Sequence, residues 1–153
     1  MGGYGGQSNR LKEKCYYDTG GRKVTDKHAI EVAEYYIRHG KYVAFLREHQ
    51  DGNRADLSVE GVHVEVKGIT SLSLNGIEKT IKHAHKQVHG DDYRYPPETY
   101  RQGKIIFLSK HSAEVPTEKI LEAMTGAVET AIRKGYLDEK VEVWIKGKIY
   151  TLT

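Results

Sequence analysis

Two short segments of alternating apolar residues, separated by a single glycine, constrain the fold of this chain more than any other feature. Ala55 to Glu60 and Val62 to Lys67 are each of strand length, and Gly61 lies between them. A connection this short can join only antiparallel neighbours, so we expect a tight β-hairpin. In the second segment valines alternate with polar residues, which places the side chains of Glu65 and Lys67 on the same face.

Segments with helical and strand periodicity surround this hairpin. Apolar residues recur at three- and four-residue spacing in the helical segments, and compact apolar runs indicate the other strands. The alternation predicts an α/β domain with a mixed central sheet flanked by helices. We expect helix 26–39, strand 42–46, hairpin strands 55–60 and 62–67, a helix from Asn75 to a stop at Gly90, loop 91–103, strand 104–109, helix 116–134, and a closing strand or hairpin over 141–145 and 149–152.

The length of 153 residues fits one domain, with little room for a second. We expect a flexible tail or linker over 1–25, which begins MGGYGG, and a single domain over 26–153. Cys15 is the only cysteine, which excludes an intrachain disulfide, and no Cys/His pair has zinc-finger spacing. We expect no membrane segment and no export signal on this chain. The formal net charge of +3 permits an anionic partner without demonstrating one.

The hairpin carries the residues with the clearest chemistry. If its turn centres on Glu60 and Gly61, Asp56 and Glu65 face each other across the two strands. Two carboxylates, a backbone carbonyl and waters form the oxygen-rich site that Mg²⁺ prefers. A bound cation activates water and neutralises charge on a phosphoryl group, and Lys67 would reach the water or the scissile phosphate. The spacing therefore predicts phosphodiester hydrolysis with Mg²⁺ or Mn²⁺. Alternatively, Glu-x-Lys on a solvated strand is an ordinary ion pair.

These residues carry a resemblance to a known family. Asp56 followed by Glu65-Val66-Lys67, a helix ahead of them and a lysine- and glutamine-bearing helix behind resemble the PD-(D/E)XK nuclease superfamily over roughly residues 26–145. The run LREHQDGNRADLSVEGVHVEVK and the helix TIKHAHKQ are most similar to the C-terminal toxin domain of contact-dependent growth inhibition (CdiA-type) proteins, whose members include tRNA nucleases. Ala55 stands where the superfamily often has proline, a change that removes no ligand.

The resemblance implies roles for individual residues. Asp56, Glu65 and the Val66 carbonyl would be the metal ligands, and Lys67 would be the catalytic lysine. Further accessory candidates are Glu48, Thr80 and Gln87, together with the acids of the first helix, Glu31 and Glu34, which are otherwise solvated helix positions.

The resemblance also implies a biological setting. It implies an RNase that cleaves tRNA, as the toxin domain of an interbacterial competition system, with a cognate immunity protein as its partner. Such a domain acts in the cytoplasm of a target cell and is secreted or surface-displayed as part of a larger protein. We expect the immunity protein to be acidic, because complementary charge speeds association with a basic site.

The helix after the hairpin and the loop that follows it are rich in basic residues. We expect nucleic-acid contacts from Lys79, Lys82, His83, Lys86, Arg94 and Arg101, the last two in a loop that also carries Tyr93, Tyr95 and Tyr100. Alternatively, the lysines form a solvated helix face and the tyrosines pack as a lid over the core. His83 or His85 would serve as a general base or a transition-metal ligand, or as a surface contact. We expect Trp144 to be half-buried core.

Two other functions remain open from the residues alone. A DNA endonuclease or junction-cleaving enzyme on the same fold would share every site residue. A catalytically silent nucleic-acid-binding module would keep the fold, and neither divalent metal nor the Asp56→Ala substitution would change its binding.

Overall fold

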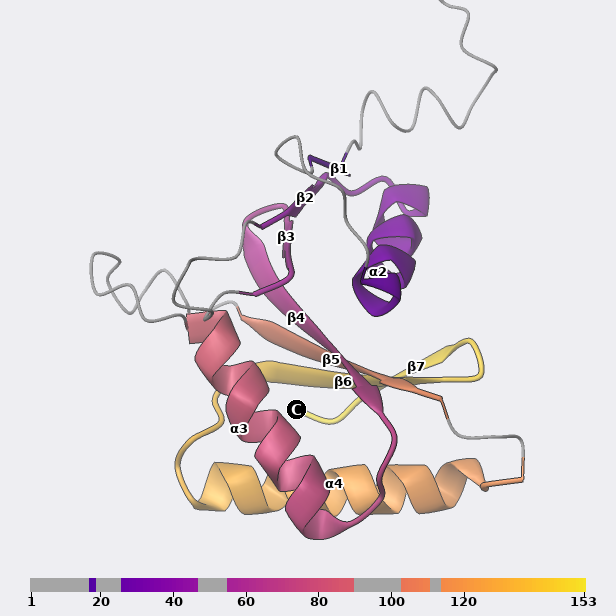
Figure 1. The fold of residues 1–153 in the computed structure, drawn as a ribbon, viewed down its shortest axis with the longest axis vertical. Helices are drawn as coiled ribbons and strands as arrows, with labels where there is room; N and C mark the ends of the chain where they lie inside the picture. Colours follow the sequence, from indigo (N-terminus) through magenta and orange to yellow (C-terminus); the bar gives the residue numbers. More distant parts are fainter. Residues whose placement is uncertain (1–16, 19–25, 47–54, 90–102, 111–113) are drawn as a thin grey trace, which may run out of the picture.

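The computed structural model describes residues 17–18, 26–46, 55–89, 103–110 and 114–153, which form an α/β fold around one mixed sheet (Figure 1). None of the helices in these ranges has the length and apolar character needed to cross a membrane. In chain order the elements are β1 (Tyr17–Asp18), α2 (Lys27–Arg38), β2 (Val43–Phe45), β3 (Leu57–Val59), β4 (Val62–Ile69), α3 (Leu74–His89), β5 (Lys104–Ser109), α4 (Thr117–Arg133), β6 (Lys140–Ile145) and β7 (Lys148–Thr151).

The seven strands lie side by side in the same order as in the chain. Strands β2, β3 and β4 form an antiparallel meander, and β5 and β6 then run parallel to β4. Strand β7 returns antiparallel to β6, as the predicted closing hairpin requires. The two parallel crossovers each contain a helix, α3 between β4 and β5 and α4 between β5 and β6, which is the usual way to join parallel neighbours. The predicted mixed sheet flanked by helices is confirmed.

The predicted hairpin is the pair β3 and β4. Its register pairs Leu57 with Val64 and Val59 with Val62, which leaves Glu60 and Gly61 as a two-residue turn. Both turn residues have positive φ, 48° and 89°, and two-residue turns of this hand match the twist of the strands. The turn therefore centres where the sequence places it. Strand β4 extends two residues beyond the predicted end, to Ile69, because its last residues pair with β5.

Alternate residues of the sheet pack against helices on opposite faces. Valines of β4 and the residues Ile106 and Leu108 of β5 pack with α2 on one face. On the other face Ile105 and Phe107 pack with α3 and α4, which contact each other (Figure 1). The apolar run of β5 is thus buried on both sides, as expected for a central parallel strand.

The predicted helices are observed with small shifts of their ends. Helix α2 begins after Asp26, whose side chain accepts hydrogen bonds from the backbone N–H groups of His28 (2.9 Å) and Ala29 (3.2 Å). Helix α4 begins directly after Pro116. In α3 the predicted apolar stripe is buried: Ile77, Ile81, Ala84 and Val88.

One strand lies in the segment expected to be a linker. Tyr17 and Asp18 form β1, which runs parallel to β2 with Tyr17 opposite Val43. Two residues are too few to show a period-2 pattern, so the sequence carries no signal for this strand. The other residues of the segment 1–25 lie outside the described ranges, as do the predicted loop over 91–102 and Glu48.

Candidate functional site

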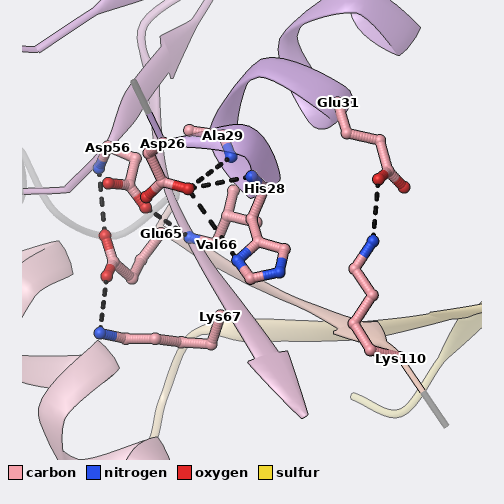
Figure 2. A network of polar contacts seen from close by, with 9 residues as sticks. All are labelled: Asp26, His28, Ala29, Glu31, Asp56, Glu65, Val66, Lys67 and Lys110. Carbon is pink, nitrogen blue, oxygen red and sulfur yellow. Dashed lines mark hydrogen bonds and ion pairs between the residues drawn. The ribbon is translucent and has the colours of Figure 1, made fainter. Parts of the chain in front are cut away.

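The hairpin brings Asp56 and Glu65 together. Asp56 directly precedes β3, and its backbone N–H donates a hydrogen bond to Oε1 of Glu65 across the hairpin (3.1 Å). The backbone N–H of Val66 donates to Oδ2 of Asp56 (2.9 Å). Figure 2 shows the two carboxyl groups facing each other between the strands. The backbone of Asp56 therefore holds the carboxyl group of Glu65, and the backbone of Val66, directly after Glu65, holds the carboxyl group of Asp56.

Lys67 completes this group. Its Nζ lies 3.0 Å from Oε2 of Glu65 (Figure 2). Because Val64 and Val66 pack on the α2 face, Glu65 and Lys67 lie on the face covered by α3. The Glu65 side chain is only 2% exposed, whereas that of Lys67 is 25% exposed. The site therefore has a buried acidic floor and a cation at its open side.

Burial and charge repulsion alter the acidity of both carboxyl groups. Desolvation, followed by the nearby charge of Asp56, raises the pKa of Glu65 to about 9. Desolvation also raises the pKa of Asp56, although hydrogen bonds from its neighbours oppose this. Two acids in contact in a low-dielectric site cannot both ionise without compensation. At neutral pH the pair therefore retains a proton unless a cation replaces it.

The donor atoms at this position fit a hard divalent cation. Asp56 and Glu65 offer carboxylate oxygens, and the adjoining peptide of Val66 offers a carbonyl oxygen. Oxygen donors with room for waters are the set that Mg²⁺ prefers, and Mn²⁺ accepts the same set. A divalent ion would supply the positive charge that the buried pair lacks.

Sequence reasoning missed a third acid beside the pair. Asp26, at the predicted start of the first helix, lies close enough for its charge to raise the pKa of Asp56. His28, in the first turn of α2, packs against Gly68, where a Cβ atom would lie 2.7 Å from the imidazole Cε1. The start of α2 is thus fitted to the end of β4 that carries Lys67. This contact depends on tertiary packing, for which the sequence has no local signal.

The acids predicted on the first helix lie elsewhere. Glu31 is exposed and accepts a hydrogen bond from Nζ of Lys110 (3.1 Å), away from Asp56 (Figure 2). Glu34 is also exposed. Glu48 falls outside the described residues. Among the acids of α2 and its cap, Asp26 is the one whose charge acts on the pair.

Helix α3 contacts β4, and its polar side presents two further candidates. Thr80 is half-buried and donates its hydroxyl to the carbonyl of Gly76 (3.0 Å). Gln87 is also half-buried, and its Oε1 is buried with no hydrogen-bond partner in the described part of the chain. A buried amide oxygen without a hydrogen bond lowers the stability of the fold, so a hydrogen-bond donor that reached Oε1 of Gln87 would be favourable.

The predicted nucleic-acid contacts on α3 lie on its exposed side. Lys79, Lys82, His83 and Lys86 are all exposed. Nζ of Lys82 lies 5.0 Å from the ring centroid of Tyr136, which directs it toward the segment after α4. Arg94 and Arg101 lie outside the described residues. Trp144 is half-buried and packs against the α2-side core, which confirms the prediction for it.

Comparison with known proteins adds no relative to this picture. No family model matches the chain, and neither a curated protein nor a solved structure is significantly similar to it. The function is therefore argued from the residues and from the geometry of the site.

Proposed function

We propose that this chain is a metal-dependent nuclease of the PD-(D/E)XK type, which hydrolyses phosphodiester bonds in RNA. One observation carries the proposal. The buried Glu65 and the half-buried Asp56 lie against each other across a hairpin, with Lys67 3.0 Å from Glu65 at the open side. A buried pair of acids with a raised affinity for protons is costly to maintain, and such groups are concentrated at functional sites.

In this proposal Asp56, Glu65 and the Val66 carbonyl hold Mg²⁺ or Mn²⁺. The bound ion would supply Lewis acidity toward a phosphoryl oxygen and lower the pKa of a bound water. The protein itself fixes the ligands, because the peptide N–H groups of Asp56 and Val66 hold the two carboxyl groups in place. A rigid supporting arrangement of this kind keeps the ligands in a productive geometry.

Lys67 would orient the attacking water or stabilise negative charge on the phosphate. When the carboxylates are occupied by a cation, the ammonium group no longer has to neutralise Glu65. Its partial exposure leaves it able to donate hydrogen bonds to phosphate oxygens from the solvent side. Such stabilisation of developing charge is typically the largest catalytic contribution of a single residue.

The substrate and the biological role rest on the resemblance together with α3. Lys79 and Lys86 give the exposed side of α3 basic groups, with His83 between them, on the helix that covers the site's face. Such a surface suits a phosphate backbone. We propose tRNA as the substrate, a toxin role in interbacterial competition, and an acidic immunity protein as the partner.

Incubation with two substrates tests the proposal. Purified protein is incubated with total tRNA and separately with supercoiled plasmid, each with Mg²⁺ and with EDTA. The Glu65→Gln variant removes a ligand but imitates the protonated acid, so it should fold. Glu129→Gln, an exposed position on α4, is the matched control. We expect Mg²⁺-dependent loss of tRNA with the wild type and with Glu129→Gln, and none with Glu65→Gln.

The other outcomes separate the alternatives. Nicking of the plasmid alone would assign the site to a DNA endonuclease. Absence of cleavage of either substrate, with binding that EDTA does not change, would leave the silent binding module as the better description.

A further inference from the structure

A second group of potential ligands lies where the C-terminal half of α3 meets the start of β6. Nδ1 of His85 is hydrogen-bonded to both carboxylate oxygens of Glu139, at 2.9 Å from Oε2 and in a shorter contact with Oε1. Oδ1 of Asp138 lies 3.9 Å from the same nitrogen. One histidine nitrogen and two carboxylates therefore converge from segments that are distant in the sequence.

The three residues lie near enough to one another to share one metal ion. One ligand atom from each of the three residues can be chosen so that all lie within 4.8 Å of one another. With metal–ligand bonds of about 2.0 to 2.2 Å, neighbouring ligands of a tetrahedral ion are roughly 3.3 to 3.5 Å apart. Movements of about 1 Å, within reach of side-chain rotations, would bring the three atoms to these separations.

The three residues differ in exposure, so the group has a buried side and a side open to solvent. The Glu139 side chain is fully buried, that of His85 is 25% exposed and that of Asp138 is 75% exposed. The backbone on the buried side is fixed, because Thr153 donates its hydroxyl to the Glu139 carbonyl (3.1 Å) and accepts the N–H of Val141 (2.8 Å). An ion can enter from the Asp138 side and keep a water there.

The donor set distinguishes this group from the Asp56–Glu65 pair. An imidazole nitrogen with carboxylate oxygens suits Zn²⁺ and similar transition metals, whereas Mg²⁺ prefers oxygen donors alone. We propose that His85, Asp138 and Glu139 form a transition-metal site of the Zn²⁺ class, which fastens α3 to β6. This proposal is independent of the nuclease function.

A metal-free ion pair between His85 and Glu139 is the competing description, and direct measurement of Zn²⁺ binding separates the two. Titration calorimetry with Zn²⁺ measures the affinity and the number of ions bound per chain. The full chain is used in the Glu65→Gln background, which removes the other site from the measurement.

Matched variants locate the binding. Asp138 is exposed, so the Asp138→Asn variant should fold and tests the site even if His85→Ala is unstable. His83 is an exposed histidine on the same helix, and His83→Ala is the control for zinc binding. We expect one Zn²⁺ per chain, with a raised midpoint of thermal unfolding, in the background protein and in His83→Ala. Loss of a residue that only supports a ligand weakens metal binding by roughly tenfold or more. Loss of a direct ligand should weaken Zn²⁺ binding by at least that amount.

Two results would overturn the proposal. They are the absence of Zn²⁺ binding, and affinity that Asp138→Asn and His85→Ala leave unchanged. Weakening in His85→Ala alone, with Asp138→Asn at full affinity, would also contradict a site built from three residues.

Discussion

Glu65 and Glu139 are two of the buried glutamates in the described part of the chain, and their acidic neighbours differ in exposure. Glu65 is 2% exposed and Glu139 is 4% exposed, and Lys67 lies beside the first and His85 beside the second. Glu65 also faces the carboxyl group of Asp56, which is itself mostly removed from water. At Glu139 the second acid, Asp138, is largely exposed and therefore well solvated.

The difference shows why burial alone does not identify a catalytic acid. At Glu139 the buried carboxylate is hydrogen-bonded to the His85 imidazole, and the neighbouring acid, Asp138, is exposed to water. At Glu65 two carboxyl groups in contact lie beside one ammonium group, so either a proton or a further cation must complete the balance. The contact between two acids in the Asp56–Glu65 pair, more than the burial of either residue, favours an all-oxygen site for a hard cation such as Mg²⁺, in contrast to the imidazole-containing group at Glu139.

The largest expected effect is a pH dependence of stability in the absence of metal. The pKa of Glu65 is about 9 in the folded chain and about 4.5 when unfolded, so the folded state binds more protons between these values. The free energy of unfolding in EDTA should therefore fall by several kcal/mol as pH rises from about 5 to about 9. Urea denaturation at a series of pH values measures this.

The matched variant isolates the contribution of Glu65. In Glu65→Gln most of the fall should disappear. A smaller fall in the same direction should remain, because Glu139 raises the pKa of His85. Addition of Mg²⁺ should reduce the fall in the wild type, since the ion binds the ionised pair. Equal pH dependence in the wild type and the variant would show that the two glutamates do not differ in this way.

The next effect concerns Lys67. Lys67→Ala should lower kcat by about 10² to 10³-fold with little change in KM, if the ammonium group stabilises charge that develops during cleavage. Steady-state kinetics on the substrate that the protein cleaves measure this, with Lys119→Ala on the exposed side of α4 as the control. A rise in KM with kcat preserved would make Lys67 a substrate-binding residue instead.

Much of the Asp56–Glu65 side of this comparison is predictable from the sequence, because its determinants are local. Alternating valines set the faces of β4, and Glu60-Gly61 supplies the positive φ values that a two-residue turn requires. The register then follows, and with it the position of Asp56 opposite Glu65. The buried stripe of α3 was predictable for the same reason, since it depends on a spacing within one helix.

The rest depends on contacts between distant segments. Asp26 reads as a helix cap in the sequence, and only the packing of α2 on the hairpin brings it beside Asp56. Glu139 precedes a strand, and its contact with His85 is not predictable from the sequence, because His85 lies 54 residues earlier on a helix. For both residues the position in a helix or strand is predictable from the sequence, whereas the contact with a distant segment is not.

Glutamine substitutions at Glu65 and Glu139 extend the comparison to stability at neutral pH, with a smaller expected effect. In EDTA at neutral pH, Glu65→Gln should leave the free energy of unfolding unchanged or raise it, because glutamine imitates the protonated acid. Glu139→Gln should lower it by about 1 to 3 kcal/mol, because a charge-assisted hydrogen bond to His85 is lost. Urea denaturation of both variants measures the difference, and equal destabilisation would contradict the distinction between the two environments.

The smallest effect tests α3, the helix that reaches both regions: it contacts β4 and its His85 holds Glu139. Lys86→Ala should weaken tRNA binding modestly and reduce the slope of log affinity against log salt concentration by about 0.7 to 0.9, the amount expected for one phosphate contact. Lys119→Ala, exposed on α4, should leave the slope unchanged. Filter binding in EDTA prevents cleavage during the measurement. If Lys86→Ala left the slope intact, the exposed side of α3 would be an ordinary solvated face, and the proposed substrate would have to approach the Asp56–Glu65 pair over other elements.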